Sequence, residues 1–277
     1  MILHTQIADE YLSGKEIISH KKDWIYKDFE NVSVDGASIF SMPDISDEMK
    51  EKVRKVLQII REVLKDFRPF NQEIWDGLFP DWRQIAAGVT VDLIVGFPEP
   101  YDAIVRYDSE GNPHVIFDLC CWSRYLEKHD IEKLARGLLT HEIFHVLTMD
   151  RYPELKEDLK EKEYRTALDE VTFNEGFAHL VSFGNDELRA VDWHSEAIRN
   201  VWKRSLLQME KALKCEDRVE QEQYLFSGQC GSYYEKFACM TGMIYLGRAW
   251  EREGVKGLKK IMEQGYQGFA QKCCDMR

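Results

Sequence analysis

The stretch Thr140-His141-Glu142-Ile143-Phe144-His145 has the pattern HExxH and lies inside an apolar-rich run over residues 131–149. On a helix, residues four positions apart stand one turn apart on the same face, so both imidazoles can reach one Zn²⁺ ion. The glutamate is then held beside the open coordination position, where it can act on a water molecule. These residues are the minimum that a zinc hydrolase requires. The HExxH pattern alone also fits a buried helix with two incidental histidines.

The residues around this motif predict a central helix whose histidines point inward. Steps of three and four connect the ligand pair with the apolar positions before it, which are Ile131, Leu134 and Leu138. Beyond Gly137 the run is apolar on every face, as is typical of a helix in the middle of its domain. A buried imidazole without a partner costs about 1–3 kcal/mol, and a metal ion would supply that partner.

The length of the chain favours one catalytic unit over residues 1–277. We expect this unit to have two lobes with a cleft between them. The N-terminal lobe, residues 1–128, would contain a small sheet, and residues 129–277 would form a helical zinc-binding lobe.

The composition excludes several classes of partner. A net charge of −12 without a cluster of Lys and Arg argues against nucleic acid and against an anionic membrane surface. Residues 1–10 lack the features of a signal peptide, and the most apolar stretch, residues 237–246, is too short to span a bilayer. The seven cysteines include two adjacent pairs and no CxxC, which indicates reduced thiols. We therefore expect a cytoplasmic protein whose partner is a peptide or protein substrate; the oligomeric state is left open.

Before the motif, the pattern changes from helix to strand. An apolar period of three to four predicts a helix over residues 46–67. Alternating or β-branched residues then predict strands over residues 88–97, 103–107 and 114–119. The turn residues 108–113 make the last two strands a hairpin, so we expect a small antiparallel sheet just before the metal helix. An unpaired edge of such a sheet can take up an extended peptide as an extra strand.

A second buried helix is predicted over residues 166–183, and it carries Glu175 among apolar residues. A buried carboxylate must be paired, protonated or bound to metal. Gly176 beside it lowers helix propensity, which indicates that another segment packs closely against the backbone there.

The remaining C-terminal segments are expected to be mostly helical. Residues 153–165 are dense in Glu and Lys and predict a solvated connector or a surface helix, and residues 187–215 predict a long helix. The sequence Ser232-Tyr233-Tyr234-Glu235 has the S-x-x-E form of a capping box and would open a helix, with Tyr234 in its first turn. Residues 255–269 predict one more packing helix.

Three separated motifs together resemble those of the gluzincin metallopeptidases, above all the aminopeptidase N family. These motifs are HEIFH at 141–145, FNEGFA at 173–178 and YEK at 234–236, and they occur in the family's order. The resemblance covers the chain from about residue 131 onward and implies an α+β, thermolysin-like catalytic fold.

The same resemblance implies the roles of individual residues. His141, His145 and Glu175 would be the zinc ligands, Glu142 the general base, and Tyr234 the phenol that stabilises the tetrahedral intermediate. The chemistry is consistent with these roles, because a His₂Glu zinc keeps one coordination position open and a phenol can donate to a developing oxyanion.

Some assignments at this site stay open. Tyr233 is the rival of Tyr234 for the phenol role. Asp169, Glu170 and His179 flank the third ligand and are either partners of the histidines or bystanders.

The chain departs from the family's pattern in three ways. The spacer between His145 and Glu175 has 29 residues and is longer than usual, and Phe237 replaces the last glycine of Y-E-K-G. The G-x-M-E-N element, whose glutamate holds the substrate's free amine, is absent from the sequence upstream of residue 141. Aminopeptidase specificity therefore does not carry over.

We predict zinc-dependent hydrolysis of peptide bonds. The alternatives are a zinc-binding protein without hydrolytic activity, a zinc hydrolase of other amides or esters, and a helical interaction module without metal. Glu99 and Glu110 lie in turn-like surroundings and do not replace the missing glutamate, whereas the strand at 114–119 could pair with a substrate backbone. This combination predicts cleavage inside extended peptides.

Overall fold

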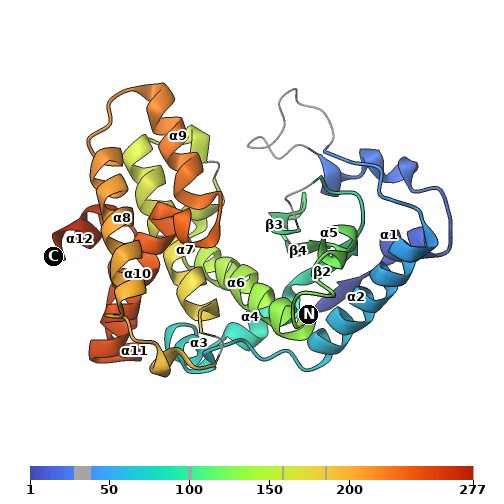
Figure 1. Cartoon of the computed structure of the whole chain (residues 1–277), viewed down its shortest axis with the longest axis horizontal. Coiled ribbons are helices and arrows are strands. Elements are labelled where there is room, and N and C mark those ends of the chain that lie inside the picture. The colour runs from blue at the N-terminus through green and yellow to red at the C-terminus, as the bar shows by residue number, and fades with distance from the viewer. Residues whose placement is uncertain (28–38, 99–101, 158, 185, 277) are drawn as a thin grey trace. The chain divides into compact units, whose positions relative to one another are not determined.

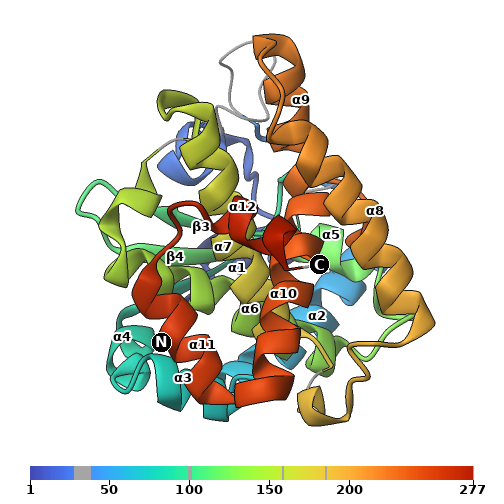
Figure 2. The same ribbon diagram turned by 90° about the vertical axis from the view of Figure 1, so that its left-hand side faces the viewer.

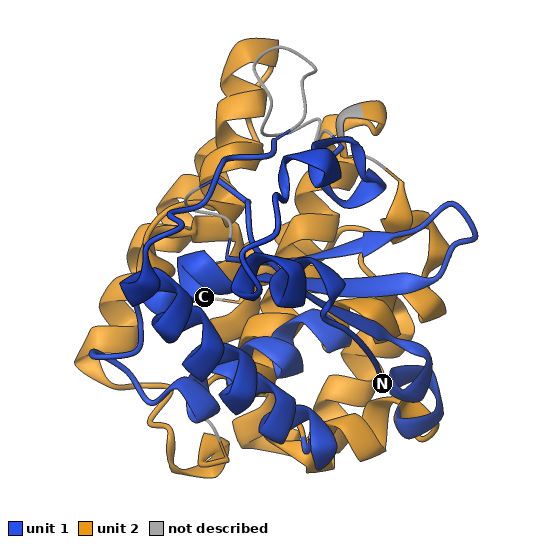
Figure 3. Ribbon diagram, turned by 90° about the vertical axis from the view of Figure 1, so that its right-hand side faces the viewer, with its two compact units in different colours: residues 1–68, 83–143 blue, residues 69–82, 144–277 orange. Residues whose placement is uncertain are grey.

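The computed structural model describes residues 1–27, 39–98, 102–157, 159–184 and 186–276. It divides into two compact units, residues 1–68 with 83–143 and residues 69–82 with 144–277 (Figure 3). One of the boundaries between these units falls within the HExxH helix, after Ile143. The two lobes expected at residues 1–128 and 129–277 stay a prediction.

Unit 1 holds the sheet and the helices that cover it (Figure 1). Its elements are β1 (Ile2–His4), α1 (Gln6–Leu12), the 3₁₀ helices η1 (Ile18–Lys22) and η2 (Trp24–Tyr26), α2 (Asp47–Lys65), most of α4 (Trp82–Gly88), β2 (Thr90–Ile94), β3 (Ala103–Tyr107), β4 (Pro113–Asp118), α5 (Leu119–Ser123) and the first part of α6 (Ile131–Arg151).

The helix predicted over residues 46–67 is confirmed as α2. It begins where the side chain of Ser46 accepts a hydrogen bond from the backbone N–H of Met49, at 3.2 Å. Its buried positions follow helical spacing and include Val53, Val56, Leu57 and Ile60. Through this face α2 packs on α5.

The sheet is mixed, so the prediction of an antiparallel sheet is wrong. The strand order is β1-β2-β4-β3, with β1 and β4 both parallel to β2 and only the β3–β4 hairpin antiparallel, as predicted for that pair. All five residues of β2 are buried, which is the property of a parallel strand covered on both faces. The apparent alternation in this part of the sequence therefore did not mark a half-exposed strand.

The place of β4 corrects a second expectation. In the described part of the chain β4 is paired on both sides, by β2 and by β3, while β1 and β3 form the sheet edges. Since its backbone groups already serve two neighbours, β4 cannot take up a substrate strand.

A buried carboxylate lies at the junction where β4 ends and α5 begins. Asp118 is fully buried and accepts hydrogen bonds from the backbone N–H groups of Phe97 and Cys121, both at 2.7 Å. Burial raises the pKa of this carboxyl, and the backbone hydrogen bonds oppose that shift. Asp118 thus caps α5 and fastens the segment after β2 to the same point.

Unit 2 is helical among its described residues (Figure 1, Figure 2). Its elements are α3 (Gln72–Leu78), the second part of α6, η3 (Pro153–Lys156), η4 (Leu159–Glu161), α7 (Tyr164–Ser182), η5 (Leu188–Ala190), α8 (Glu196–Ala212), α9 (Arg218–Gln229), η6 (Tyr233–Glu235), α10 (Phe237–Glu253), α11 (Val255–Gln264) and α12 (Phe269–Asp275).

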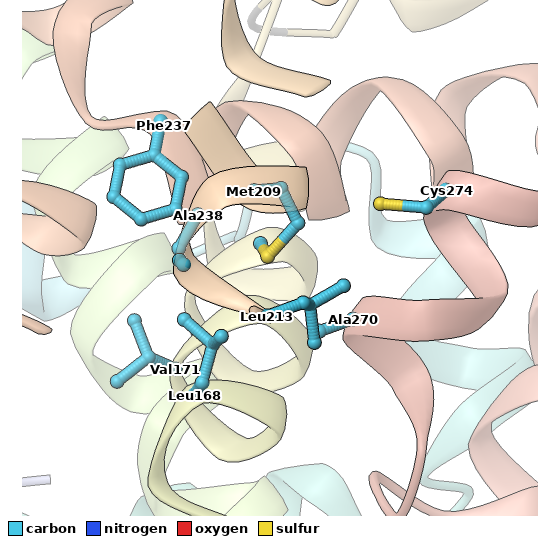
Figure 4. Close-up of a cluster of buried hydrophobic side chains, with 9 residues drawn as sticks. Leu168, Val171, Met209, Leu213, Phe237, Ala238, Ala270 and Cys274 are labelled. Carbon is cyan, nitrogen blue, oxygen red and sulfur yellow. The ribbon is translucent and has the colours of Figure 1, made fainter. Parts of the chain in front are cut away.

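A cluster of buried apolar side chains joins α7 to the helices around it. Figure 4 shows Leu168 and Val171 of α7 near Met209 of α8, Phe237 of α10 and Ala270 of α12. Burial of such side chains contributes about 1.5–3 kcal/mol each, so this cluster fixes α7 firmly within unit 2.

Helices α7 and α10 cross at a pair of glycines. A Cβ atom on Gly176 would lie 2.7 Å from the Cα of Gly242, and one on Gly242 would lie 2.0 Å from the carbonyl oxygen of Thr172. Side chains at these two positions would force the helices apart. The close approach predicted at Gly176 is confirmed, and Gly242 is its counterpart.

Other C-terminal predictions need correction. Ser232 makes no side-chain capping bond, and Tyr234 lies in the separate 3₁₀ turn η6 before α10. The long helix predicted from residue 187 begins only at Glu196, after Ser195 caps it, and α9 was not predicted. The tail forms two helices, because Gly265 and Gly268 adopt positive φ between them.

The described chain is mainly helical with one small four-stranded sheet, which is consistent with an α+β protein. No helix in the described ranges combines the length and the apolarity that a bilayer span requires.

Candidate metal centre

The HExxH stretch lies on α6, which confirms the predicted helix. His145 is 6% exposed and Glu142 and His141 are half-buried. The hydroxyl groups of Thr140 and Thr148 donate hydrogen bonds to the backbone carbonyl oxygens of the residues one turn earlier on the helix, at 2.8 and 2.9 Å. The four-residue step places both histidines on one face of this helix.

Glu175 reaches His145 from α7. Its Oε1 lies 3.3 Å from Nε2 of His145, and its side chain is 22% exposed. Zinc bonds of about 2.0–2.1 Å in tetrahedral geometry separate neighbouring ligand atoms by about 3.4 Å. The observed pair therefore has the spacing of two atoms that share one zinc ion.

His179 follows Glu175 by one turn of α7 and lies against it. Its Nδ1 is 2.9 Å from the backbone carbonyl oxygen of Glu175 and 3.3 Å from Oε2 of the same residue. Glu175 and His179 on α7, together with the histidines of the motif on α6, supply one carboxylate and several imidazoles. Imidazole nitrogens and a carboxylate oxygen are donors that zinc prefers, so the donor types of this site fit the metal.

The other two acidic residues near Glu175 have different partners. Asp169 accepts hydrogen bonds from the backbone N–H groups of Gly268 and Ala270, at 2.7 and 2.9 Å, which ties α7 to the start of α12. Glu170 forms a buried ion pair with Lys162. These contacts hold the fold together, whereas His179 contacts the predicted ligand itself.

The ion pair is an exception within the segment 153–165, where most of the described residues are exposed or half-buried, as predicted for a solvated segment. The side chains of Lys162 and Glu170 are only 6% and 3% exposed. A charge this deeply buried requires a counter-charge, so the side chain of Lys162 points inward although the rest of its segment is polar. Burial raises the pKa of Glu170, and the contact with Lys162 opposes that shift.

The two tyrosines before α10 have different surroundings. Tyr233 lies with its ring centroid 5.4 Å from that of His179 and nearly parallel to Phe183, at an interplanar angle of 16°. Tyr234 is 47% exposed, packs edge-on against Tyr233, and accepts a hydrogen bond at its carbonyl oxygen from Arg204. The assignment of the phenol role to Tyr234, with Tyr233 as rival, stays a prediction.

One buried thiol near Glu175 was not predicted. Cys239 of α10 is fully buried, with Sγ 3.9 Å from Oε2 of Glu175 and 3.4 Å from the carbonyl oxygen of Gly228. Burial raises its pKa well above the usual range, so it is a protonated thiol at neutral pH. Nothing in the sequence around Cys239 indicated this contact, which depends on the crossing of α7 and α10.

The chain was compared with known families and proteins. A family model described as "Putative zinc dependent peptidase (DUF5700)" matches residues 27–243, well over half of the chain. The chain belongs to this family. The zinc dependent peptidase match includes HExxH, Glu175, His179 and both tyrosines, and it supports the prediction of a zinc peptidase at that coarse level. Neither the curated proteins nor the solved structures gave a significant match.

Proposed function

We propose that the chain is a zinc metallopeptidase of gluzincin type that hydrolyses peptide bonds, with His141, His145 and Glu175 as zinc ligands. The observation that carries this proposal is the 3.3 Å approach of Glu175 Oε1 to Nε2 of His145 in the HExxH motif. The family description supports it independently.

The proposed reaction uses the residues next to the ligands. A bound zinc ion would polarise the scissile carbonyl and lower the pKa of water towards 7. Glu142 removes a proton from the attacking water as its oxygen bonds to the carbonyl carbon. The same carboxyl then delivers that proton to the amide nitrogen as the C–N bond breaks, which leaves a free acid and an amine.

The phenol of Tyr234 is proposed to donate a hydrogen bond to the oxyanion that develops on the carbonyl oxygen. Loss of one such donor costs about 2.7–4 kcal/mol in turnover. Tyr233 is the alternative, because its ring lies beside His179. Phenylalanine substitutions at the two positions separate them, since only the donor's loss lowers kcat while zinc content stays the same.

We propose peptides cleaved internally as the substrate class. An α-amine left unpaired in a dry cleft would cost several kcal/mol, and the sequence lacks the G-x-M-E-N glutamate that would pair it. Pairing of substrate with β4 no longer supports this proposal, which rests on the missing glutamate alone.

We also place the peptidase in the cytoplasm. The structure describes all seven cysteines, and none of them forms a disulfide. Free thiols are typical of a reducing compartment.

The first experiment tests the metal. Purified protein should contain one zinc ion per chain by elemental mass spectrometry, and His141→Ala should contain little. Because a metal stabilises the folded state that binds it, chelation should lower the melting temperature of the wild type and leave that of His141→Ala unchanged. A wild-type protein that stays metal-free when zinc is added would refute the proposal.

The second experiment tests the reaction. Peptide mixtures incubated with zinc-loaded protein are analysed by mass spectrometry, with Glu142→Gln as the inactive variant and Glu132→Gln, an exposed change on the same helix, as its control. We expect internal cuts by wild type and Glu132→Gln, and zinc without cleavage in Glu142→Gln. Products shortened one residue at a time from free amino termini would refute internal cleavage. Zinc binding without any cleavage would favour a zinc-binding protein, and cleavage of esters alone would favour a non-peptide hydrolase.

A further inference from the structure

The two carboxylate oxygens of Glu175 have different neighbours. Oε1 lies 3.3 Å from Nε2 of His145, which belongs to the HExxH motif. Oε2 lies 3.3 Å from Nδ1 of His179 and 3.9 Å from Sγ of Cys239. One oxygen therefore faces a predicted zinc ligand, and the other faces the interior between α7 and α10.

The backbone contact of His179 determines which ring nitrogen carries the proton. Nδ1 lies 2.9 Å from the carbonyl oxygen of Glu175, and a carbonyl oxygen can only accept a hydrogen bond. Nδ1 must therefore be the N–H donor of this ring. A protonated nitrogen has no lone pair for zinc, so His179 cannot bind the metal through Nδ1 in this arrangement.

The same nitrogen lies 3.3 Å from Oε2, which is close enough for its N–H to be shared between the backbone and the side chain of Glu175. Because χ3 of glutamate has a broad, two-fold preference, a carboxylate without such a contact rotates easily about its last bond. A hydrogen bond to one oxygen removes this freedom and selects the other oxygen for the metal.

We propose that His179 is a positioning residue: its Nδ1–H holds Oε2 of Glu175, so that Glu175 presents Oε1 alone to the zinc ion. This inference rests on the proposed function, because it takes Glu175 as the third ligand. His179 itself has 4% exposure, which keeps water from competing for the bond.

The crossing of α7 and α10 also restricts the space around Oε2 of Glu175. Gly176 and Gly242 allow α10 to lie directly against α7, and Cys239 lies three residues before Gly242 on α10. Its buried thiol occupies the space beside Oε2. The carboxylate of Glu175 thus contacts His179 on its own helix and Cys239 on α10.

The experiment measures zinc affinity by competition with a chromophoric chelator in three variants. His179→Leu removes the donor and should weaken zinc binding about 10–100-fold. His179→Asn keeps an amide N–H where Nδ1 stood and should bind zinc within a few-fold of the wild type. His194→Leu makes the same change at an exposed histidine, paired with Glu251, and should leave the affinity unchanged.

X-ray absorption of the zinc-loaded wild type needs no variant and should show two imidazoles with one carboxylate oxygen at bonding distance. Three imidazoles would make His179 a ligand and overturn the proposal. Undiminished zinc affinity in His179→Leu, or no rescue by His179→Asn, would also overturn it. A wild type that binds no zinc would instead refute the proposed function, so the two failures are distinguishable.

Discussion

Substitution of Gly242 by alanine tests the helix crossing on which the metal centre is built. The new Cβ would lie 2.0 Å from the carbonyl oxygen of Thr172 and 2.9 Å from the Cα of Gly176. A carbon atom and a carbonyl oxygen in contact are normally at least about 3.3 Å apart, so α10 would have to move by about 1.3 Å. The obstacle is backbone inside a helix, which cannot turn aside as a side chain can.

The energetic cost follows from two opposed effects. Alanine improves helix propensity over glycine by about 1 kcal/mol. Overpacking costs about 1–3 kcal/mol, occasionally more, and a rigid backbone obstacle places Gly242→Ala at the upper end of that range or beyond. We expect a net loss of about 2 kcal/mol in the free energy of unfolding.

Urea unfolding followed by circular dichroism measures this loss in the metal-free protein, so that zinc binding does not contribute. Gly88→Ala is the matched control, because no atom lies within 4 Å of the position that its new methyl group would take and its φ is not positive. This control should be unchanged or slightly more stable. A Gly242→Ala protein as stable as Gly88→Ala would show that α7 and α10 do not cross as closely as described.

Two further predictions concern charged groups away from the ligands. Lys162→Met should destabilise the chain by about 3–5 kcal/mol because it leaves Glu170 buried without its counter-charge, and adding Glu170→Leu should restore most of the loss in urea unfolding; a double variant no better than the single one would contradict this. Burial lowers the pKa of His20, but hydrogen bonds to Asp23 and Glu10 more than offset it, so the net shift is upward. Its contribution is therefore complete below the unfolded pKa of about 6.5 and is lost as pH rises through the higher folded value. The stability difference between wild type and His20→Gln should shrink from pH 5.5 to pH 8.5, and a constant difference would refute the assignment.

Helical periodicity predicted the long elements well. The helices α2, α6 and α7 each carry a continuous apolar pattern over several turns, so their positions could be read from the sequence. The β3–β4 hairpin was marked by its turn residues. These signals are local, and local patterns are what a single sequence displays.

The errors concern features that depend on distant segments. One parallel partner of β2 is β1, which pairs across 88 residues because Ile2 lies opposite Thr90, and β1 has only three residues, all of them exposed. The S-x-x-E letters before α10 resembled a cap, but the chain forms a 3₁₀ turn there instead. The local sequence alone shows neither which strands pair in parallel nor whether an S-x-x-E stretch caps a helix.

The candidate site likewise combines features that the sequence indicates with features that only the structure shows. The contact of His145 with Glu175 agrees with a pairing that motif order had suggested, and the ligand roles stay a prediction. The step of four from Glu175 to His179 was visible in the sequence, yet only the structure shows which nitrogen meets which oxygen. The nearness of Cys239 required the crossing at Gly242 and had no sequence signal.

The mixed sheet has a consequence for the order in which the chain folds. The β3–β4 hairpin closes a short turn, whereas β1 must find β2 across 88 residues, since Ile2 pairs with Thr90. The entropy of loop closure rises with this separation, and the exposed residues of β1 bury little apolar surface in return. The first strand in the sequence should therefore be the last to join the sheet and the first to leave it during local opening.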